Sequence, residues 1–413
     1  MERRRDARVA RRRGCIGVVA MALQTSGCGL TEIAAWEDDH GSAFDGGAPP
    51  TIHRWKELVV VDPTLLADGA DNTDPNAPWS FRRQLEWFAQ SSERAPRLAL
   101  EWLSEWTSLV EVGDDRAPVV TRPGVQTMLL DPWQALGTDA HAERGLPLEH
   151  APFRLIAIVN RLDLALSPCD GGGGELRYVY AGEDPSTGAS LDMTVIVEVP
   201  YPLTRTAAEW ARAWNAVVRE DSEGYAAALE ELTRAIQDHV DPARARLRTN
   251  ERAFAPEMGW ELREFHRAEA EDGLTLGQVP LASTPREDLP EGVLAAALNT
   301  HADAVLDGTL VLPSALQGGA ASLRTPDFRW RVPEVDEELA TAFSAGTCNG
   351  CHGGEREALP FQHIAPGAAS ADPARLSRFL NDPDGGRDDL TRREERLLEL
   401  IGVTCPDTEE GYP

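Results

Sequence analysis

Three runs of apolar or alternating residues in the middle of the chain restrict its fold most strongly. The run 154–159 is apolar after its first residue, 175–180 alternates between polar and apolar residues, and 193–199 is rich in β-branched residues before Pro200. Such runs are typical of β-strands, and the glycine-rich segments between them predict turns. The sequence therefore predicts a sheet built on these three strands.

Helical periodicity lies on both sides of the predicted strands. Residues 80–110 are expected to form two helices broken at Pro96, and residues 206–240 a helical pair. Residues 294–306 predict a further helix. The tryptophans of these helices are expected in the core.

A β-hairpin is expected after the helical pair. Residues 260–265 and 274–281 have strand character, and Asp272-Gly273 between them is a strong turn signal. Together with the helices, this pattern predicts an α+β body in which a mixed β-sheet is covered by helices.

The first 28 residues follow the order of a bacterial secretory signal. Seven arginines stand against Glu2 and Asp6, an apolar run covers residues 16–23, and small residues precede Cys28. The apolar run is too short to cross a bilayer, and no later stretch of about 18 uncharged apolar residues is present. We therefore expect an exported protein, periplasmic or held in the cell envelope, with no transmembrane helix in the mature chain.

The small residues before Cys28 resemble the site at which bacterial lipoproteins are cut and acylated, although Thr25 stands where leucine is usual. A lipid anchor on Cys28, in an outer-membrane lipoprotein, is one expectation and free secretion is the other. A disordered basic N-terminus is the structural alternative to a signal. Residues 29–50 are rich in Gly, Ala, Asp and Pro, which suits a flexible tether between signal and body.

The chain is strongly acidic, with a formal net charge of −28 over 413 residues. Such a surface repels nucleic acid and anionic lipid, so no nucleic-acid partner is expected. It favours cationic partners or simply keeps the protein soluble. Because no catalytic-triad order, phosphate loop or dinucleotide fingerprint is present, an electron-transfer or binding role is favoured over catalysis.

One motif carries specific chemistry. Cys348, Cys351 and His352 have the Cys-x-x-Cys-His spacing of c-type haem attachment, in which two thiols add to the vinyl groups of a porphyrin and the histidine binds iron. Chance gives this spacing roughly 0.002 times in a chain of this composition. We expect a covalent haem c on Cys348 and Cys351, with His352 as an axial ligand and with Gly350 and Gly353 relieving crowding at the ring edge.

Other interpretations of the motif stay open. In the first two, the thiols would form a local disulfide or act as a redox pair. In the third, they would bind zinc in a site that adds His363 as fourth ligand. A redox pair normally lies beside a thioredoxin-like βαβ unit, whereas this motif is flanked by a predicted helix and a loop. Zinc is therefore the stronger alternative. Zinc or a disulfide would fit a non-redox binding or structural lipoprotein.

The surroundings of the motif resemble a short c-type cytochrome domain. An expected helix over 333–343 precedes the motif, and an expected amphipathic helix over 388–401 follows it. The resemblance implies a small all-α, cytochrome c-like segment with a distal iron ligand after the motif. Since no methionine follows Met258, His363 is the leading distal candidate, and Met258, Met193 or a vacant position are the alternatives.

The region before the motif resembles uncharacterised secreted bacterial proteins that end in the same element, on stretches from 153–163 to 247–251. The resemblance implies a fixed pairing of body and motif, and no known activity. The chain is expected to divide into a body over 51–316, a linker over 317–333 and a haem-binding segment over 334–413. We expect a monohaem protein that transfers electrons to a redox partner or senses redox state, its body serving as a docking or binding domain.

Two further groups of residues are expected to support the fold. Cys169 and Cys405 are the cysteines left outside signal and motif, and an oxidising compartment would allow a disulfide between them. Asn160, Arg161 and Asp163 follow a predicted buried strand, where ligand-binding loops of sheet proteins often begin, and three charged residues of the other strands could join them. A structural Arg–carboxylate network is favoured over a ligand site. The full set is Asn160, Arg161, Asp163, Glu175, Arg177 and Glu198.

Overall fold

The computed structural model describes residues 50–139, 144–218, 222–270, 273–290, 292–359, 361–386 and 388–406. The predicted signal, Cys28 and nearly all of the predicted tether lie outside the described residues, as does Asp272 of the hairpin turn. None of the described helices is long and apolar enough to cross a membrane.

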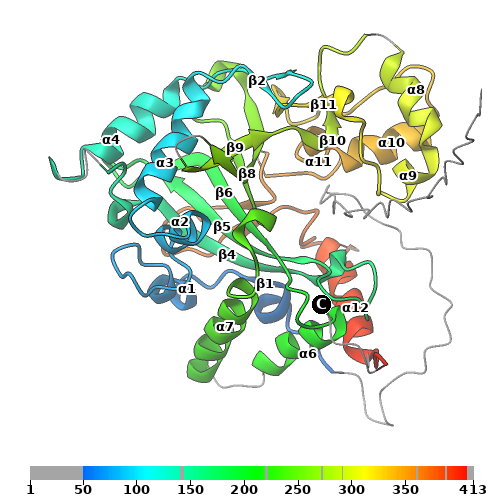
Figure 1. The fold of residues 1–413 in the computed structure, drawn as a ribbon. Coiled ribbons are helices and arrows are strands. Elements are labelled where there is room, and N and C mark those ends of the chain that lie inside the picture. Colours follow the sequence, from blue (N-terminus) through cyan, green and yellow to red (C-terminus); the bar gives the residue numbers. More distant parts are fainter. Residues whose placement is uncertain are drawn as a thin grey trace, which may run out of the picture.

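An eight-stranded sheet forms the centre of an α+β fold (Figure 1). Its strands follow the order β1-β4-β5-β6-β7-β8-β12, and β9 pairs with β8. The three predicted strands and the predicted hairpin are confirmed, whereas β7 was not predicted. The strands are β1 (Val59–Val60), β4 (Phe153–Arg161), β5 (Glu175–Glu183), β6 (Ser190–Pro200), β7 (Arg246–Glu251), β8 (Trp260–Ala270), β9 (Gly273–Val279) and β12 (Ala321–Leu323).

Every strand pair among the described residues is antiparallel, so the expectation of a mixed sheet is wrong. The connections explain this. Short turns join β5 to β6 and β8 to β9, and short turns allow only antiparallel pairing. The longer loop over 162–174 joins β4 to β5 and also returns the chain antiparallel to the strand that it left. Between β6 and β7 the chain forms two helices, α6 (Ala207–Val217) and α7 (Ser222–Gln237), and this even number returns it to the same end of the sheet.

Helices of the N-terminal half lie along one side of the sheet (Figure 1). The predicted break between the first two long helices lies before Pro96 rather than at it. Gln90 ends α2 with a φ of 51°, and Pro96 stands in the first turn of α3, where its missing N–H removes no helical hydrogen bond. These helices are α1 (Pro63–Gly69), α2 (Phe81–Ala89), α3 (Ala95–Ser104) and α4 (Asp131–Gln134).

The two faces of the sheet differ in chemistry because neighbouring residues of a strand point to opposite sides. Tyr178 faces the helices and shares the main hydrophobic core with Trp102 and Trp106, so the expected core tryptophans are confirmed. The opposite face carries Arg177, whose cross-strand neighbour is Glu198. That face is therefore charged although it is largely buried.

A second group of helices packs around its own small core. Leu298 of α8, Val305 of α9 and Phe343 of α10 meet there. The helix predicted over 294–306 is broken at His301 into α8 and α9. Figure 1 shows this group beside β10 and β11. The elements are β10 (Leu281–Pro285), α8 (Val293–Thr300), α9 (Ala302–Leu306), β11 (Gln317–Gly318), α10 (Glu337–Gly346) and α11 (Cys348–Cys351).

The predicted linker over 317–333 does not separate two packed bodies. Its residues form β11 and β12, and β12 pairs with β8 as an outer strand of the main sheet. Its Phe328 and Trp330 contact each other over 5.5 Å between ring centroids, and Trp330 also packs on Phe343 of α10. The chain is therefore packed continuously from the sheet to the motif.

The chain after the motif returns to the body. Helix α12 (Asp389–Gly402) packs on α6, and its Leu390, Leu397 and Leu400 belong to the main core (Figure 1). A disulfide joins Cys405 to Cys169 across 236 residues of sequence. The C-terminal residues are thus not gathered into a separate cytochrome c-like unit in the described structure. The remaining short strands are β2 (Glu111–Val112), β3 (Ala117–Pro118), β13 (Ile364–Ala365) and β14 (Arg375–Leu376).

Candidate functional site

The Cys-x-x-Cys-His motif forms a single helical turn, α11, capped by Thr347. The Thr347 hydroxyl accepts a hydrogen bond from the Gly350 N–H at 3.1 Å and donates to the Ser344 carbonyl at 2.8 Å. The body adds a second anchor, because the Cys348 N–H donates to Thr284 Oγ1 of β10 at 2.9 Å. Since residues three apart lie on one side of a helical turn, Cys348 and Cys351 share a side of α11.

The glycines of the motif are required by the protein backbone itself. A Cβ on Gly350 would lie 2.0 Å from the Ser344 carbonyl oxygen, and a Cβ on Gly353 would lie 2.7 Å from the Asn349 carbonyl oxygen. Both distances are far below van der Waals contact. The structure therefore gives these glycines a role in the packing of α11, and their expected role at a ring edge stays a prediction.

The four predicted ligand residues lie together. Cys348 is 5% exposed, Cys351 0% and His352 7%, and neither cysteine takes part in a disulfide. The Sγ atom of Cys351 lies 3.3 Å from Nε2 of His363, and the rings of His352 and His363 lie 4.7 Å apart. The loop between motif and His363 is thus long enough to bring both imidazoles to one site.

His352 is held in one orientation. Its Nδ1 lies 2.7 Å from the main-chain carbonyl of Phe361, and because a carbonyl only accepts, Nδ1 carries the hydrogen. Nε2 is then the nitrogen with an available lone pair, as in metal-bound histidines whose other nitrogen donates to a carbonyl. Phe361 has a φ of 70°, a left-handed conformation that is rare for a bulky residue.

Both ring nitrogens of His363 contact other side chains. Nε2 contacts Cys351, and Nδ1 lies 3.0 Å from the hydroxyl of Ser377. Its ring also lies 5.2 Å from that of Phe379. Ser377 was not singled out from the sequence, because nothing in the sequence shows that residues 375–376 pair with 364–365 and bring it back to His363.

The body supplies one wall of the site. Trp260 of β8 stacks on His352, with ring centroids 4.9 Å apart and ring planes 23° apart. Leu262 and Leu323 share a hydrophobic cluster with Cys348 and Trp260. Sequence analysis missed these residues because the pairing of β12 with β8 that brings them to the motif is long-range.

The donor set fits a c-type haem in its chemistry. Two thiols on one turn and an imidazole with Nε2 available are what such a group requires, and the neighbouring aromatic rings form an apolar lining. The described residues contain no group of three His, Cys, Asp or Glu side chains arranged to hold a metal ion. Of the alternative distal residues, Met193 is buried in the main core and so is removed from the motif.

The predicted network of charges is confirmed at the end of β4. Asp163 accepts two hydrogen bonds from Arg161, at 2.8 and 3.0 Å, and one from Arg392 of α12 at 2.8 Å. Burial alone would raise the pKa of Asp163, but Arg161 and its neighbouring arginines hold it well below its usual range. Asn160 joins the same region by donating to the Glu57 carbonyl and accepting from a tyrosine hydroxyl.

The network continues across the charged face of the sheet. Glu175 pairs with Arg177 and Arg246, and Glu198 pairs with Arg177, Arg246 and Arg248. Burial would raise the pKa of Glu175, but Arg177 and Arg246 lower it to about 2. Because each predicted member has a protein partner, the arrangement supports the structural interpretation of these residues.

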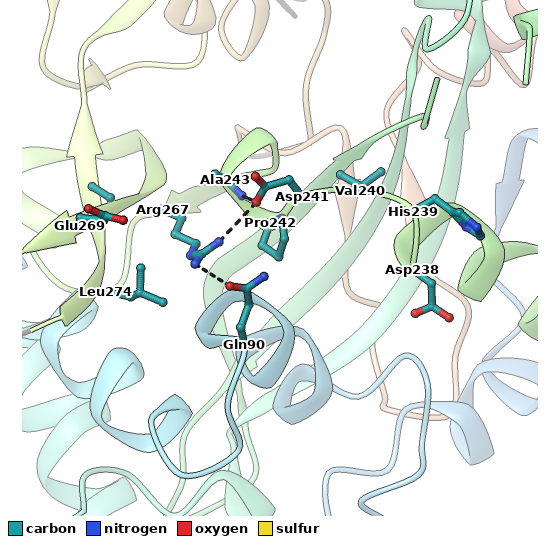
Figure 2. A pocket seen from close by; sticks show the side chains of 11 residues that line it. Gln90, Asp238, His239, Val240, Asp241, Pro242, Ala243, Arg267, Glu269 and Leu274 are labelled. Carbon is teal, nitrogen blue, oxygen red and sulfur yellow. Dashed lines mark hydrogen bonds and ion pairs between the residues drawn. The ribbon is translucent and has the colours of Figure 1, made fainter. Parts of the chain in front are cut away.

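An open groove of about 570 Å³ lies elsewhere, beside the β8–β9 hairpin (Figure 2). Arg267 donates to Gln90 at 2.8 Å and to Asp241 at 3.4 Å across it. His239 and Asp238 lie at one end of the groove in Figure 2. None of the predicted site residues lines it, so the motif remains the candidate site.

No protein family, curated protein or solved structure matches the chain, so the site is interpreted from its geometry and residue types.

Proposed function

We propose that the protein is an exported monohaem c-type protein that transfers electrons or senses redox state. The observation that carries the proposal is the orientation of His352: its Nδ1 donates to the Phe361 carbonyl at 2.7 Å, next to a turn that holds Cys348 and Cys351. This arrangement supports the proposal because it holds two thiols and one oriented imidazole within five consecutive residues, which is the donor set that a covalent haem requires. The body would serve as the docking or binding domain.

Each residue has a distinct task in this proposal. Cys348 and Cys351 would form the thioether bonds, His352 would bind iron, and His363 is the leading candidate for the distal ligand. When bound, haem supplies one-electron chemistry at iron. Trp260 fixes the His352 ring by stacking and helps to keep water from the site.

An oxidising compartment agrees with the remaining cysteines. Cys169 and Cys405 are joined in a disulfide, and such bonds persist mainly outside the cytoplasm. We therefore propose that the chain is exported to the periplasm or cell envelope by residues 1–28. If Cys28 carries a lipid anchor, Cys28→Ser should release mature protein into the soluble fraction with unchanged haem content.

The direct test is haem staining after denaturing electrophoresis of the full chain made in cells that attach haem c. Thioether bonds survive unfolding, whereas axial coordination does not. The wild type should stain, and Cys348→Ala combined with Cys351→Ala should not. The matched control is Cys169→Ala combined with Cys405→Ala, which removes two cysteines away from the motif and should keep the stain.

The contact between Cys351 and His363 favours one second candidate. A thiol 3.3 Å from an imidazole nitrogen is a spacing that two ligands of one zinc ion also have. In that case the protein would be a non-redox binding or structural lipoprotein. A colourless wild type with stoichiometric zinc would support this candidate against haem, and a colourless wild type with a Cys348–Cys351 disulfide would support a purely structural motif.

A further inference from the structure

The indole of Trp260 has a buried donor without an acceptor in the described structure. Trp260 is 1% exposed, and its Nε1 has no hydrogen-bond partner. Five other tryptophans in the described residues donate through Nε1, those at positions 79, 133, 210, 214 and 330. A buried donor left unsatisfied costs about 1–3 kcal/mol. No described residue therefore supplies an acceptor for this N–H.

Among the described tryptophans with such a donor, Trp260 is the one that touches the motif. Trp102 and Trp106 also lack a partner for Nε1, and both are enclosed by aromatic rings in the main core. Trp260 instead stacks on His352 at 4.9 Å and on Phe361 at 6.1 Å. The indole that lacks an acceptor thus lies at the candidate site.

The backbone holds Trp260 firmly in this position. Trp260 pairs with Leu323 of β12, and Gly259 before it has a φ of 79°. A Cβ on Gly259 would lie 2.1 Å from the Leu323 carbonyl oxygen, so the chain approaches β12 as closely as only glycine permits. The backbone of Trp260 is therefore fixed at the edge of the sheet, and the indole is enclosed at 1% exposure.

A second buried donor without a hydrogen-bond partner lies near His363, with Phe379 between them. Nε of Arg356 is buried without a hydrogen-bond partner, and its guanidinium lies 5.0 Å from the ring centre of Phe379. Phe379 in turn contacts His363. One indole N–H and one guanidinium N–H around the two imidazoles call for an acceptor-rich, negatively charged group.

We infer that Trp260, a residue of the body, is a binding residue of the site and that its indole N–H donates to a carboxylate of the group held by the motif, which for haem is a propionate. The inference rests on the proposed function. It makes the body part of the haem site rather than only a docking domain. Arg356 supplies a second donor to the same acid groups.

The test compares Trp260→Phe with wild type in holoprotein made from the full chain. Phenylalanine keeps an aromatic ring beside His352 and removes the N–H. Without that donor the carboxylate charge is less compensated, which favours ferric iron, and the ratio of reduced to oxidised haem at a fixed solution potential should fall about five-fold. Trp106→Phe is the matched control: it removes an equally unpartnered N–H from the main core and should leave the ratio unchanged.

Stability gives a second readout. Trp260→Phe should lower the free energy of unfolding more in holoprotein than in a haem-free background that carries Cys348→Ala and Cys351→Ala, since only the holoprotein loses a hydrogen bond. If Trp260→Phe does not fold, the benzothiophene analogue of tryptophan at position 260 keeps the shape and still lacks the N–H.

The outcomes separate the two claims. A wild type without haem would overturn the proposed function, and with it this inference. Full haem content with the same reduced-to-oxidised ratio in wild type and Trp260→Phe, and equal losses of stability with and without haem, would overturn the role of Trp260 alone.

Discussion

The carbonyl of Phe361 accepts a hydrogen bond from Nδ1 of His352 over 2.7 Å. Phe361 lies nine residues after His352 and makes this contact with its backbone in the left-handed region, at a φ of 70°. Strain of this kind persists where the surrounding structure imposes it. The loop after the motif is therefore built to orient His352.

Replacing His363 with Ala tests its role as the distal ligand. If Nε2 binds iron, the variant loses a strong-field imidazole, and the oxidised spectrum should move from low-spin towards high-spin. Ser377→Ala is the control, because it removes the partner of Nδ1 and leaves the imidazole in place. A spectrum that does not change in His363→Ala would assign His363 to structure only.

The disulfide between Cys169 and Cys405 should stabilise the body. It closes a loop of 236 residues and ties the end of α12 to the connection between β4 and β5. Replacing both cysteines with Ala should lower the free energy of unfolding in urea by about 2–4 kcal/mol. The same loss should appear when wild type is measured with a reductant. Equal stability of wild type and variant would show that the bond does not form in solution.

Asp163→Asn should destabilise the fold strongly. The substitution breaks a buried set of ion pairs with Arg161 and Arg392, for which the expected loss is about 3–5 kcal/mol. Asp192→Asn is the matched control, because Asp192 pairs with Arg252 at a more exposed position, where the loss is about 0–1 kcal/mol. Similar losses in both variants, measured by urea unfolding, would contradict the role given to the network.

The same carboxylate predicts a response to acid. Its neighbouring arginines depress the folded pKa of Asp163 below the unfolded value. The stabilising contribution is therefore complete above about pH 4 and is lost as the pH falls through the folded pKa. Unfolding free energies measured between pH 5 and pH 2 should fall more steeply for wild type than for Asp163→Asn. Parallel curves would contradict the depressed pKa.

Glu251 predicts the opposite dependence of the free energy of unfolding on pH. Burial raises the pKa of Glu251 to about 7, although Arg122 lies 3.2 Å away. Because the folded pKa lies above the unfolded value, this group stabilises the fold below about pH 4.5, and the contribution is lost as the pH rises through 7. Between pH 4.5 and 7 the free energy of unfolding should therefore decline with rising pH, and in Glu251→Gln this decline should be smaller than in wild type by on the order of 1–3 kcal/mol. The exposed control Glu257→Gln should decline as the wild type does. Identical profiles would refute it.

The elements that sequence analysis found are those with local signals. Apolar or alternating runs predict β4, β5 and β6, and a stripe of large apolar residues predicts α6 and α7. β7 was missed because its Arg246 and Arg248 are partly buried against carboxylates, and a sequence does not distinguish such paired charges from exposed ones. The mixed sheet was wrong because the direction of β7 depends on how two helices return the chain.

The candidate site could be predicted by residue type and spacing, but its walls could not. The thiols and the imidazoles of His352 and His363 are visible in the sequence. Trp260 and Ser377 reach the site through strand pairings between distant residues, and no local pattern encodes those pairings. A separate cytochrome-like segment was expected because the sequence does not show the long-range contacts of α12. In the structure, α12 packs into the main core.

The measurement that tests the central claim most directly is the mass of the peptide containing Cys348, Cys351 and His352, isolated from the mature wild-type protein after export. The account predicts one haem bound to this peptide through both sulfur atoms. It also predicts that a chain without residues 1–28, which remains in the cytoplasm, yields the same peptide with two thiols. An exported peptide without haem, or a peptide with haem from the cytoplasmic chain, would contradict the account.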